Sequence, residues 1–258
     1  MQTNSKIAVA GATGRVGHHV VEVLEERGYT VVPFSRSSGV DLITGNGLRE
    51  ALAGVDLVID TATGPAPEQQ AATEFFTTAA RNLQEAGAEA RVQRVVAVSI
   101  IGCDRFASGY NAAKVAHERA TLAGPIPAAI LRAAQFHELV GQVIDWGRQG
   151  DVAYVPEMRT QPVAARTAAE ALVELATAKD ISTAGPIPEI AGPREENMVE
   201  LARLLALKGG DGLRVESVRN PDDPEAELYV TGALLPNPHA TLAGPTFEQW
   251  LEAHSPAA

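Results

Sequence analysis

The sequence predicts an α/β fold built on a doubly wound parallel sheet, and three observations support this prediction. Predicted strands and helices alternate along the first half of the chain, the strands are continuous apolar runs, and a glycine-rich loop joins the first strand to the first helix. Continuous apolar strands are buried on both faces, which is typical of a parallel sheet with helices on each side. The right-handed crossover rule then favours the doubly wound arrangement.

The first half of the chain supplies the predicted sheet and the helices that cover it. Apolar, β-branched runs identify the strands, and apolar residues at helical spacing identify the helices. We expect Gly28 and Gly87 to end the helices that precede them. The predicted strands are 6–10, 29–34, 55–60, 92–99 and 128–131, and the predicted helices are 18–27, 48–53, 68–85 and 112–122.

The pattern loosens after about residue 136. We interpret this half as a small C-terminal lobe laid over the carboxyl edge of the sheet, within one domain that spans residues 1–258. A proline-rich stretch precedes the last helix. The predicted helices are 139–148, 165–178, 198–207 and 247–253, and the predicted strands are 152–155, 186–191 and 213–218.

Composition limits the classes of function. The 258 residues include 32 acidic and 21 basic ones, and the net charge of −11, without a basic stripe, disfavours binding to nucleic acid. The chain has one cysteine, Cys103, so it cannot form an internal disulfide. The sequence also contains no cluster of Cys and His residues that would indicate a metal site. No apolar run reaches the ~18–20 residues of a membrane span, and the short polar N-terminus does not resemble a signal peptide. We expect a cytoplasmic monomer or homodimer that binds no membrane.

The glycine loop predicts a Rossmann-type site for a nicotinamide dinucleotide. Gly11, Gly14 and Gly17 follow the first strand and open the first helix. The first glycine permits a tight turn, the second lets the backbone approach a pyrophosphate, and the third allows close helix–strand packing. The alternative, a glycine turn without a ligand, is disfavoured by this position between strand and helix. We expect cofactor contacts from Gly11, Thr13, Gly14, Arg15, Val16 and Gly17.

The end of the second predicted strand favours NADP(H) over NAD(H). An NAD site usually carries Asp or Glu about 20 residues beyond the glycine loop to hold the ribose 2′-hydroxyl. Here the strand ends at Phe34 and continues Ser35-Arg36-Ser37, without a carboxylate. Arg36 is suited to bind a 2′-phosphate, with Arg15 approaching from the glycine loop. The alternative for each arginine is that its side chain is a solvated surface charge without a ligand. Further cofactor contacts are expected from Ser35 or Ser37, from Asp41 and Leu42 near the adenine, and from Thr61, Ala62 and Thr63.

Three residues are candidates for catalysis. Tyr110 and Lys114 are four residues apart at the start of a predicted helix, so both project from one face. A lysine beside a phenol stabilises the phenolate and lowers the pKa of the tyrosine, which makes it a usable proton donor or acceptor near neutral pH. Ser99 ends the preceding strand at the edge where ligands bind in open α/β sheets, and its hydroxyl is placed to hold a carbonyl oxygen.

Together these segments resemble the NmrA-like group of atypical short-chain dehydrogenase/reductases. The resemblance extends over nearly the whole chain, and its glycine loop is specific to the superfamily. It departs from the group at Ile100 or Ile101, where many relatives have a second serine, and at Thr167, where many have an acid. The similar segments are 11–17, 95–99, 110–114, 131–132, 134–137, 161–164, 191–193 and 246–251.

The resemblance implies a Rossmann fold, preference for NADP(H), and Ser99, Tyr110 and Lys114 in the catalytic positions, with Lys114 also holding the nicotinamide ribose. The group also contains cofactor-sensing regulators that have lost the tyrosine, and this chain retains it. An enzyme is therefore favoured. The alternatives are a non-catalytic NADP(H)-binding regulator and an isomerase or cyclase with the same fold.

We expect an oxidoreductase that reduces a carbonyl or an activated double bond of a small organic molecule. Residues 1–135 would form mainly the dinucleotide-binding core, and residues 136–258 mainly the substrate-binding lobe. For His137 a polar pocket or surface position is the alternative to an acid–base role, and for Met158 the alternative is packing. The candidates for substrate contacts are Ile100, Phe136, His137 and Met158.

Overall fold

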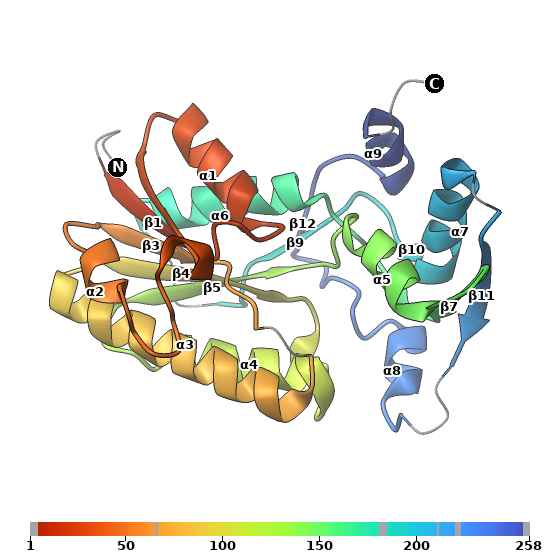
Figure 1. Ribbon diagram of the computed structural model, residues 1–258, viewed down its shortest axis with the longest axis horizontal. Coiled ribbons are helices and arrows are strands. Elements are labelled where there is room, and N and C mark those ends of the chain that lie inside the picture. Colours follow the sequence, from red (N-terminus) through yellow and green to blue (C-terminus); the bar gives the residue numbers. More distant parts are fainter. Residues whose placement is uncertain (1–4, 65–66, 181–184, 211, 220–222, 255–258) are drawn as a thin grey trace. The chain divides into compact units, whose positions relative to one another are not determined.

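The structure is a computed structural model that describes residues 5–64, 67–180, 185–210, 212–219 and 223–254. The chain divides into two compact units (Figure 1). Unit 1 comprises Met1–Ser99, Ala107–Arg132 and Ala168–Pro188, and unit 2 comprises Ile100–Phe106, Ala133–Thr167 and Glu189–Ala258. The change from unit 1 to unit 2 after Arg132 lies close to the predicted boundary at residue 135, while the single-domain organisation stays a prediction.

Unit 1 contains the predicted parallel sheet. Its strands follow the order β5-β4-β3-β1-β2, and β1 pairs in parallel with both β2 and β3, as β3 does with β4. The chain order therefore reverses between β1 and β3, and ligands bind at the carboxyl ends of the strands beside such a reversal. The strands are β1 (Lys6–Ala10), β2 (Thr30–Phe34), β3 (Leu57–Asp60), β4 (Arg94–Ile100) and β5 (Ala128–Ala133).

Helices cover both faces of these strands. Figure 1 shows α3 and α4 side by side on one face, and α1 with most of α6 on the other. All four residues of β3 are buried, as expected of a strand between two helical layers, whereas β2 at the edge is partly exposed. The doubly wound α/β fold is confirmed. The helices are α1 (Gly17–Glu26), α2 (Leu48–Ala51), α3 (Gln69–Ala90), α4 (Gly109–Leu122) and α6 (Ala165–Thr177).

The two glycines predicted to end helices behave differently. Gly28 follows the end of α1 with a φ of 77°, in the left-handed region that glycine adopts at little cost. The prediction for Gly87 is wrong, because α3 continues through it to Ala90. A Cβ on Gly87 would lie 2.6 Å from the Ile126 side chain, so the glycine permits close packing there and does not end the helix.

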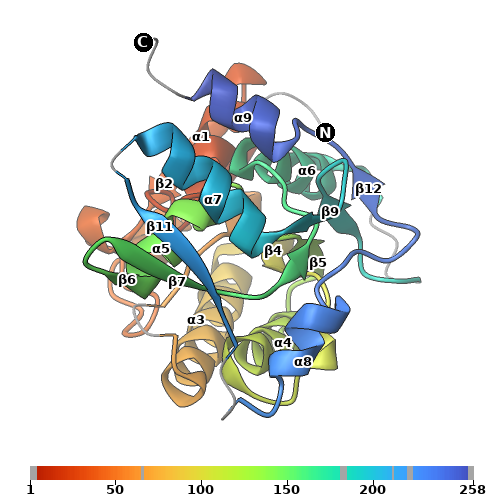
Figure 2. The same cartoon turned by 90° about the vertical axis from the view of Figure 1, so that its right-hand side faces the viewer.

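Unit 2 is built around a small sheet with the order β11-β7-β6, against which α5 and α7 pack (Figure 2). Its strands are β6 (Arg148–Gln149), β7 (Val152–Pro156), β8 (Arg159–Thr160), β9 (Glu189–Ala191), β10 (Glu196–Asn197), β11 (Arg214–Val218) and β12 (Thr241–Leu242). Its helices are α5 (Leu139–Gly147), α7 (Met198–Gly209), α8 (Ala226–Thr231) and α9 (Phe247–Ala253).

The predictions for unit 2 are confirmed for the longer elements and incomplete for the short ones. The predicted strand 186–191 is limited to β9, and residues 181–184 before it lie outside the described residues. Helix α8 was not predicted, because it is a short helix within the proline-rich stretch.

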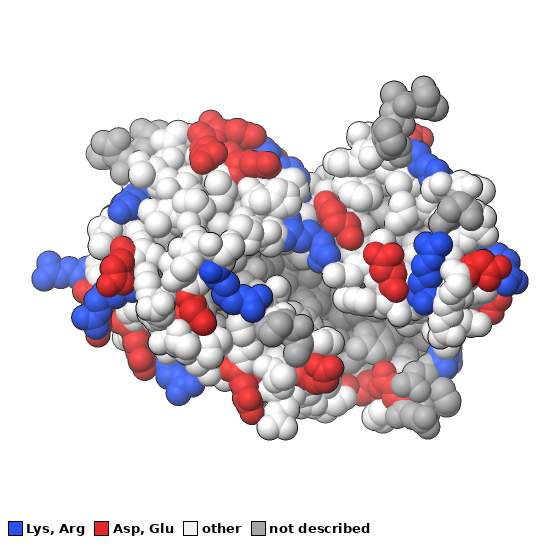
Figure 3. Space-filling view, viewed as in Figure 1, with Lys and Arg blue, Asp and Glu red and all other residues white. Residues whose placement is uncertain are grey.

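Charged side chains of both signs are interspersed over the face drawn in Figure 3. In the part of the chain that the structure describes, no helix is long and apolar enough to span a membrane. Within the same residues, no three His, Cys, Asp or Glu side chains form a group suited to a metal ion. The absence of nucleic-acid partners and of a metal stays a prediction.

Candidate functional site

The glycine loop is a tight turn at the carboxyl ends of three strands of unit 1. The amide of Gly11 donates to the carbonyl of Phe34 at the end of β2, at 3.0 Å, and Gly11 has a φ of 73°. A Cβ on Gly11 would lie 2.8 Å from the Cα of Ala62, which follows β3, and a Cβ on Gly17 would collide with the Gly11 carbonyl. Only glycine fits at these two positions, so the backbone leaves a cradle that suits a pyrophosphate.

A cleft of about 1080 Å³ opens beside this loop and lies within unit 1. The structure brings together there most of the residues predicted to bind the cofactor. The exceptions are Arg15, Val16 and Gly17, where α1 begins, and Lys114 of α4, none of which lines the cleft. The sequence did not predict that residues of α3 line the cleft, because no sequence motif marks the face of a helix that borders a ligand site. The lining includes Gly11, Thr13, Gly14, Ser35, Arg36, Asp41, Leu42, Thr61, Ala62 and Thr63, together with Ala71, Glu74, Phe75 and Thr78 of α3.

The far end of the cleft is rich in hydroxyl groups and carries an exposed arginine. The amide of Ser35 donates to Oγ of Ser38 at 2.9 Å, and the hydroxyls of Ser35 and Ser37 are 2.8 Å apart. Arg36 begins the 3-10 turn Arg36–Ser38, and no carboxylate ends β2. A cation and hydroxyls in this place can bind an anionic group.

Side-chain hydrogen bonds hold a polar loop, residues 41–44, that lines the cleft. Oδ1 of Asp41 accepts the amides of Ile43 and Thr44, at 2.7 and 3.3 Å. Asn82 of α3 donates to the carbonyl of Leu42 at 2.7 Å. Asp41 thus has a structural task in shaping this loop, and its contact with adenine stays a prediction.

Ser99 and Tyr110 occupy unit 1 as predicted, but the electrostatics of Tyr110 differ from expectation. Ser99 lies near the end of β4 and is buried, and Tyr110 lies in the first turn of α4 with its ring 5.7 Å from that of Phe76. Burial raises the pKa of Tyr110. The predicted lowering of this pKa by Lys114 is therefore wrong for this structure, because removal of the phenol from water disfavours the phenolate.

Lys114 is buried and held by its own unit. Its Nζ donates to the carbonyl of Val98 and to Nδ1 of His117, both at 2.9 Å, and it lies 4.3 Å from the centre of the Phe76 ring. Nε2 of His117 lies 3.1 Å from Oδ2 of Asp60, the last residue of β3. A continuous hydrogen-bonded chain thus joins Lys114 through His117 to Asp60.

The sequence analysis missed Asp60, Phe76 and His117. Burial alone would raise the pKa of Asp60, but the hydrogen bonds from His117 and the Ala62 amide and the charge of Lys114 hold it below its usual value. Burial and the neighbouring Lys114 lower the pKa of His117 in spite of Asp60. The two signals in the sequence were an acidic residue ending a buried strand and a histidine one helical turn beyond Lys114, but their meeting across 57 positions depends on the fold.

A second buried ion pair fixes the same helix. Nε and Nη2 of Arg132 on β5 donate to the two carboxylate oxygens of Glu118, each at 2.8 Å. This paired, two-point geometry is the stronger kind of arginine–carboxylate contact. It anchors α4 and hence the position of Lys114, one turn away.

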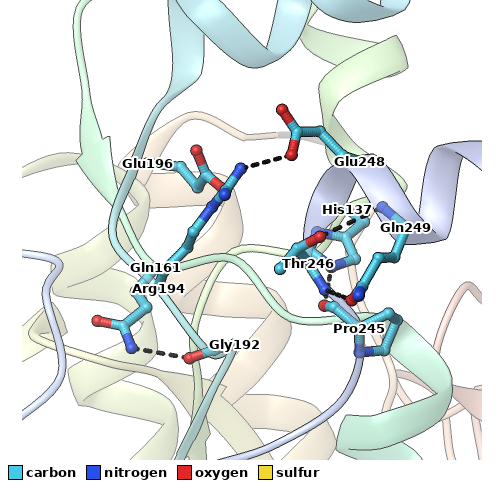
Figure 4. A network of polar contacts seen from close by, with 9 residues as sticks. All are labelled: His137, Gln161, Gly192, Arg194, Glu196, Pro245, Thr246, Glu248 and Gln249. Atoms are coloured by element: carbon cyan, nitrogen blue, oxygen red, sulfur yellow. Dashed lines mark hydrogen bonds and ion pairs between the residues drawn. The ribbon is translucent and has the colours of Figure 1, made fainter.

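The predicted substrate residues belong to unit 2. His137 is 1% exposed, its Nε2 lies 3.1 Å from the carbonyl of Pro245, and its ring centre is 5.5 Å from that of Phe247. Figure 4 shows it beside the first turn of α9, where Thr246 and Gln249 form reciprocal hydrogen bonds. Burial lowers the pKa of His137. The structure therefore gives His137 a packing environment.

The other three candidates are spread over unit 2. Phe136 forms an isolated parallel bridge with Val163. Met158 packs against two apolar clusters, and the smaller one, around Phe106 and Leu234, also includes Ile100. Their roles in substrate binding stay predictions.

Residues 11–138 match a family model described as NAD(P)H-binding. No curated protein matches the chain in sequence. Among solved structures, a short-chain dehydrogenase/reductase superfamily protein from Agrobacterium tumefaciens with bound NAD has a TM-score of 0.68 at 18% identity, covering 96% of this chain and 95% of that one.

Two further structures are similar over nearly the full length. dTDP-4-dehydrorhamnose reductase from Bacillus anthracis, in complex with NADP, has a TM-score of 0.71 at 16% identity, covering 97% of this chain and 98% of its own. UDP-N-acetylglucosamine 4-epimerase from Bacillus cereus has a TM-score of 0.69 at 20% identity, covering 96% and 94%. These similarities confirm the fold, and the oxidoreductase class stays a prediction. Residues 11–138 are thus similar to the NAD(P)H-binding family, and the fold of the chain is similar to the folds of these solved structures.

Proposed function

We propose that this protein is an NADP(H)-dependent oxidoreductase that reduces a carbonyl or an activated double bond of a small organic molecule. The observation that carries this proposal is the placement of Tyr110 and a buried, hydrogen-bonded Lys114 in the same unit as the glycine cradle. Both follow the strand that ends near Ser99, and β4 neighbours β3, whose end lines the cofactor cleft.

The cleft supports NADP(H) as the preferred cofactor. Gly11 and Gly14 would lie against the pyrophosphate, and Arg36 with the hydroxyls of Ser35 and Ser37 would hold the 2′-phosphate. Lys114 would hold the hydroxyls of the nicotinamide ribose. These residues fit a dinucleotide with an extra phosphate better than one without it.

The catalytic roles follow from the protonation states of the residues. A bound nicotinamide would supply a hydride to the substrate. Tyr110 keeps its proton at neutral pH because burial raises its pKa, and this protonated phenol is the form that a reduction requires as acid. The Ser99 hydroxyl would orient the substrate oxygen, and the Lys114 ammonium would stabilise the phenolate that remains after proton transfer.

An isomerase is the second candidate, because one similar structure is a sugar-nucleotide epimerase. Such an enzyme would convert its substrate without net consumption of cofactor. The third alternative is a regulator that binds NADP(H) without turnover. The single cysteine, Cys103, is buried and has no second cysteine with which to form an internal disulfide, which agrees with the proposed reducing cytoplasm.

The experiment that tests the proposal is an assay of NADPH oxidation, followed at 340 nm (about the absorbance maximum of the reduced nicotinamide), with a panel of aldehydes, ketones, enones and imines. We expect oxidation with at least one class, and product analysis should show the reduced bond. Substrate conversion without NADPH loss would identify an isomerase. Tight NADPH binding with no conversion of any compound would favour the regulator.

A further inference from the structure

The chain from Lys114 through His117 to Asp60 is buried at every member. Lys114 is 4% exposed, His117 1% and Asp60 2%. An isolated ammonium in such a place is costly, because it loses its hydration without an opposite charge in return. The carboxylate of Asp60 supplies that opposite charge from another element of the same unit, and His117 joins the two.

The hydrogen bonds define the proton positions. The lysine ammonium has donors and no acceptor, so Nδ1 of His117 must accept the bond from Nζ. A neutral His117 then carries its proton on Nε2 and donates it to Oδ2 of Asp60. Oδ1 of Asp60 accepts the Ala62 amide at 2.9 Å, which fixes the orientation of the carboxylate. Every bond in the chain therefore runs from donor to acceptor in one direction, from Lys114 to Asp60.

We propose that His117 and Asp60 are positioning residues for Lys114, which hold its ammonium charged and fixed in place through a neutral imidazole bridge. This inference rests on the proposed function for the role of Lys114. The imidazole is itself fixed, because its ring stacks on Phe76 with the ring centres 4.8 Å apart.

The other charged groups around this chain are already compensated. Glu118, the residue after His117, is paired with Arg132 of β5. From α3 the ring of Phe76 faces both Lys114 and His117, and Tyr110 of α4, whose pKa burial raises, packs against the same ring. Asp60 is thus the carboxylate that balances Lys114.

Three substitutions separate a positioning role of these two residues from a merely structural one. Asp60→Asn keeps the shape, but an amide cannot accept both from the Ala62 N–H and from Nε2 of His117, so one bond of the chain is lost in either orientation. His117→Gln replaces the imidazole by an amide that can accept from Lys114 and donate to Asp60. The less conservative His117→Phe removes both bonds. Gln84→Met is the matched control, because Gln84 is a buried polar residue of unit 1 that bonds to Thr121 and Ile126, outside this chain.

The first measurement is NADPH affinity by fluorescence titration across pH. We expect Asp60→Asn and His117→Phe to weaken binding about tenfold to hundredfold, as for a lost buried bond to a charge, and to move the alkaline loss of affinity to lower pH. His117→Gln should restore most of the affinity, and Gln84→Met should leave it unchanged. Binding by Asp60→Asn and His117→Phe that equals that of the unmodified protein at every pH would overturn the proposal.

The second measurement is independent of cofactor binding. In the ¹⁵N-histidine spectrum of the unmodified protein, His117 should be the neutral tautomer with its proton on Nε2. Should the unmodified protein fail to bind NADPH, the proposed function falls, and this spectrum still decides on the bridge. A proton on Nδ1 would overturn it, because Lys114 would then have no acceptor on the ring.

Discussion

Units 1 and 2 each bury a histidine, and the two have different surroundings. His117 and His137 are both 1% exposed, and burial lowers the pKa of each. In unit 1 the imidazole lies between a lysine and a carboxylate, whereas in unit 2 it packs among aromatic rings and contacts one backbone carbonyl. Burial thus lowers the pKa of both histidines. What distinguishes them is that His117 forms hydrogen bonds to two charged side chains.

The comparison teaches that burial and a shifted pKa do not by themselves locate a site. Perturbed titratable groups occur in functional sites and in purely structural networks. His117 of unit 1 contacts Asp60 at the end of β3, in the same sheet that carries the glycine loop, and it contacts the candidate catalytic residue Lys114. The histidine of unit 2 contacts two aromatic rings of α9 and a backbone carbonyl, and the carboxylates of Glu138 and Glu196 only partly offset the lowering of its pKa by burial. The predictions below test this difference.

The largest effect is expected for Tyr110→Phe. This change removes the proposed proton donor of unit 1, so turnover should fall by about 10²–10⁴-fold, the usual contribution of general acid catalysis. The affinity for NADPH should stay nearly unchanged, because the proposed role of the phenol is toward the substrate. Steady-state kinetics beside cofactor titration would measure both. Full activity of the variant would mean that another group carries the proton.

Lys114→Met should damage both stability and cofactor binding. It retains much of the side-chain volume but leaves the Asp60 carboxylate buried without its opposite charge, which costs about 3–5 kcal/mol when a buried pair is broken. Chemical denaturation would give the loss of stability, and titration would give the loss of NADPH affinity. A variant as stable as the unmodified protein would show that the buried charge is balanced in another way.

Arg36→Ala should act on cofactor choice alone. NADPH binding should weaken by about 1–3 kcal/mol, the range of hydrogen bonds to charged groups, while NADH binding hardly changes. Arg27, an exposed arginine at the end of α1, provides a matched control that should not discriminate. Equal weakening of both cofactors by Arg36→Ala would rule out a contact with the 2′-phosphate.

The smallest effect concerns stability against pH, where the two histidines should behave alike. Because burial lowers both pKa values, the folded protein keeps both rings neutral while the unfolded chain takes up protons below about pH 6.5. The free energy of unfolding should therefore fall as the pH decreases below this value, by at most about 1.4 kcal/mol per pH unit for each histidine. His117→Gln and His137→Gln should each reduce this slope. A slope unaffected by either substitution would show that both rings titrate equally in the folded and unfolded chains.

The sequence predicted the features that depend on the local conformation of the chain. The apolar strands of unit 1 and the glycine turn at Gly11 are readable because each depends on residues adjacent in the chain. The prediction that Gly87 ends a helix was wrong. A glycine is needed there because the side chain of Ile126, 39 positions away in the sequence, packs against it. Likewise, Asp60 could not be linked to His117 before the sheet and α4 were placed together.

In unit 2 the sequence predicted the longer helices and strands, but it did not predict the short strands or the contacts of the candidate substrate residues. Short strands such as β8 and β10 owe their existence to pairing with each other, and their two-residue segments carry no pattern. His137 was a reasonable candidate from its position after β5, but its contacts with Pro245 and Trp250 join segments more than 100 residues apart.

The most direct test of the account is a titration of the unmodified protein with NADPH and with NADH under identical conditions. The structure of unit 1 predicts binding of one NADPH per chain, with an affinity at least about tenfold higher than that for NADH, because Arg36 and its neighbouring hydroxyls would hold the 2′-phosphate. Equal dissociation constants for the two cofactors would contradict the proposed NADP(H) preference, and no binding of either would contradict the proposed function.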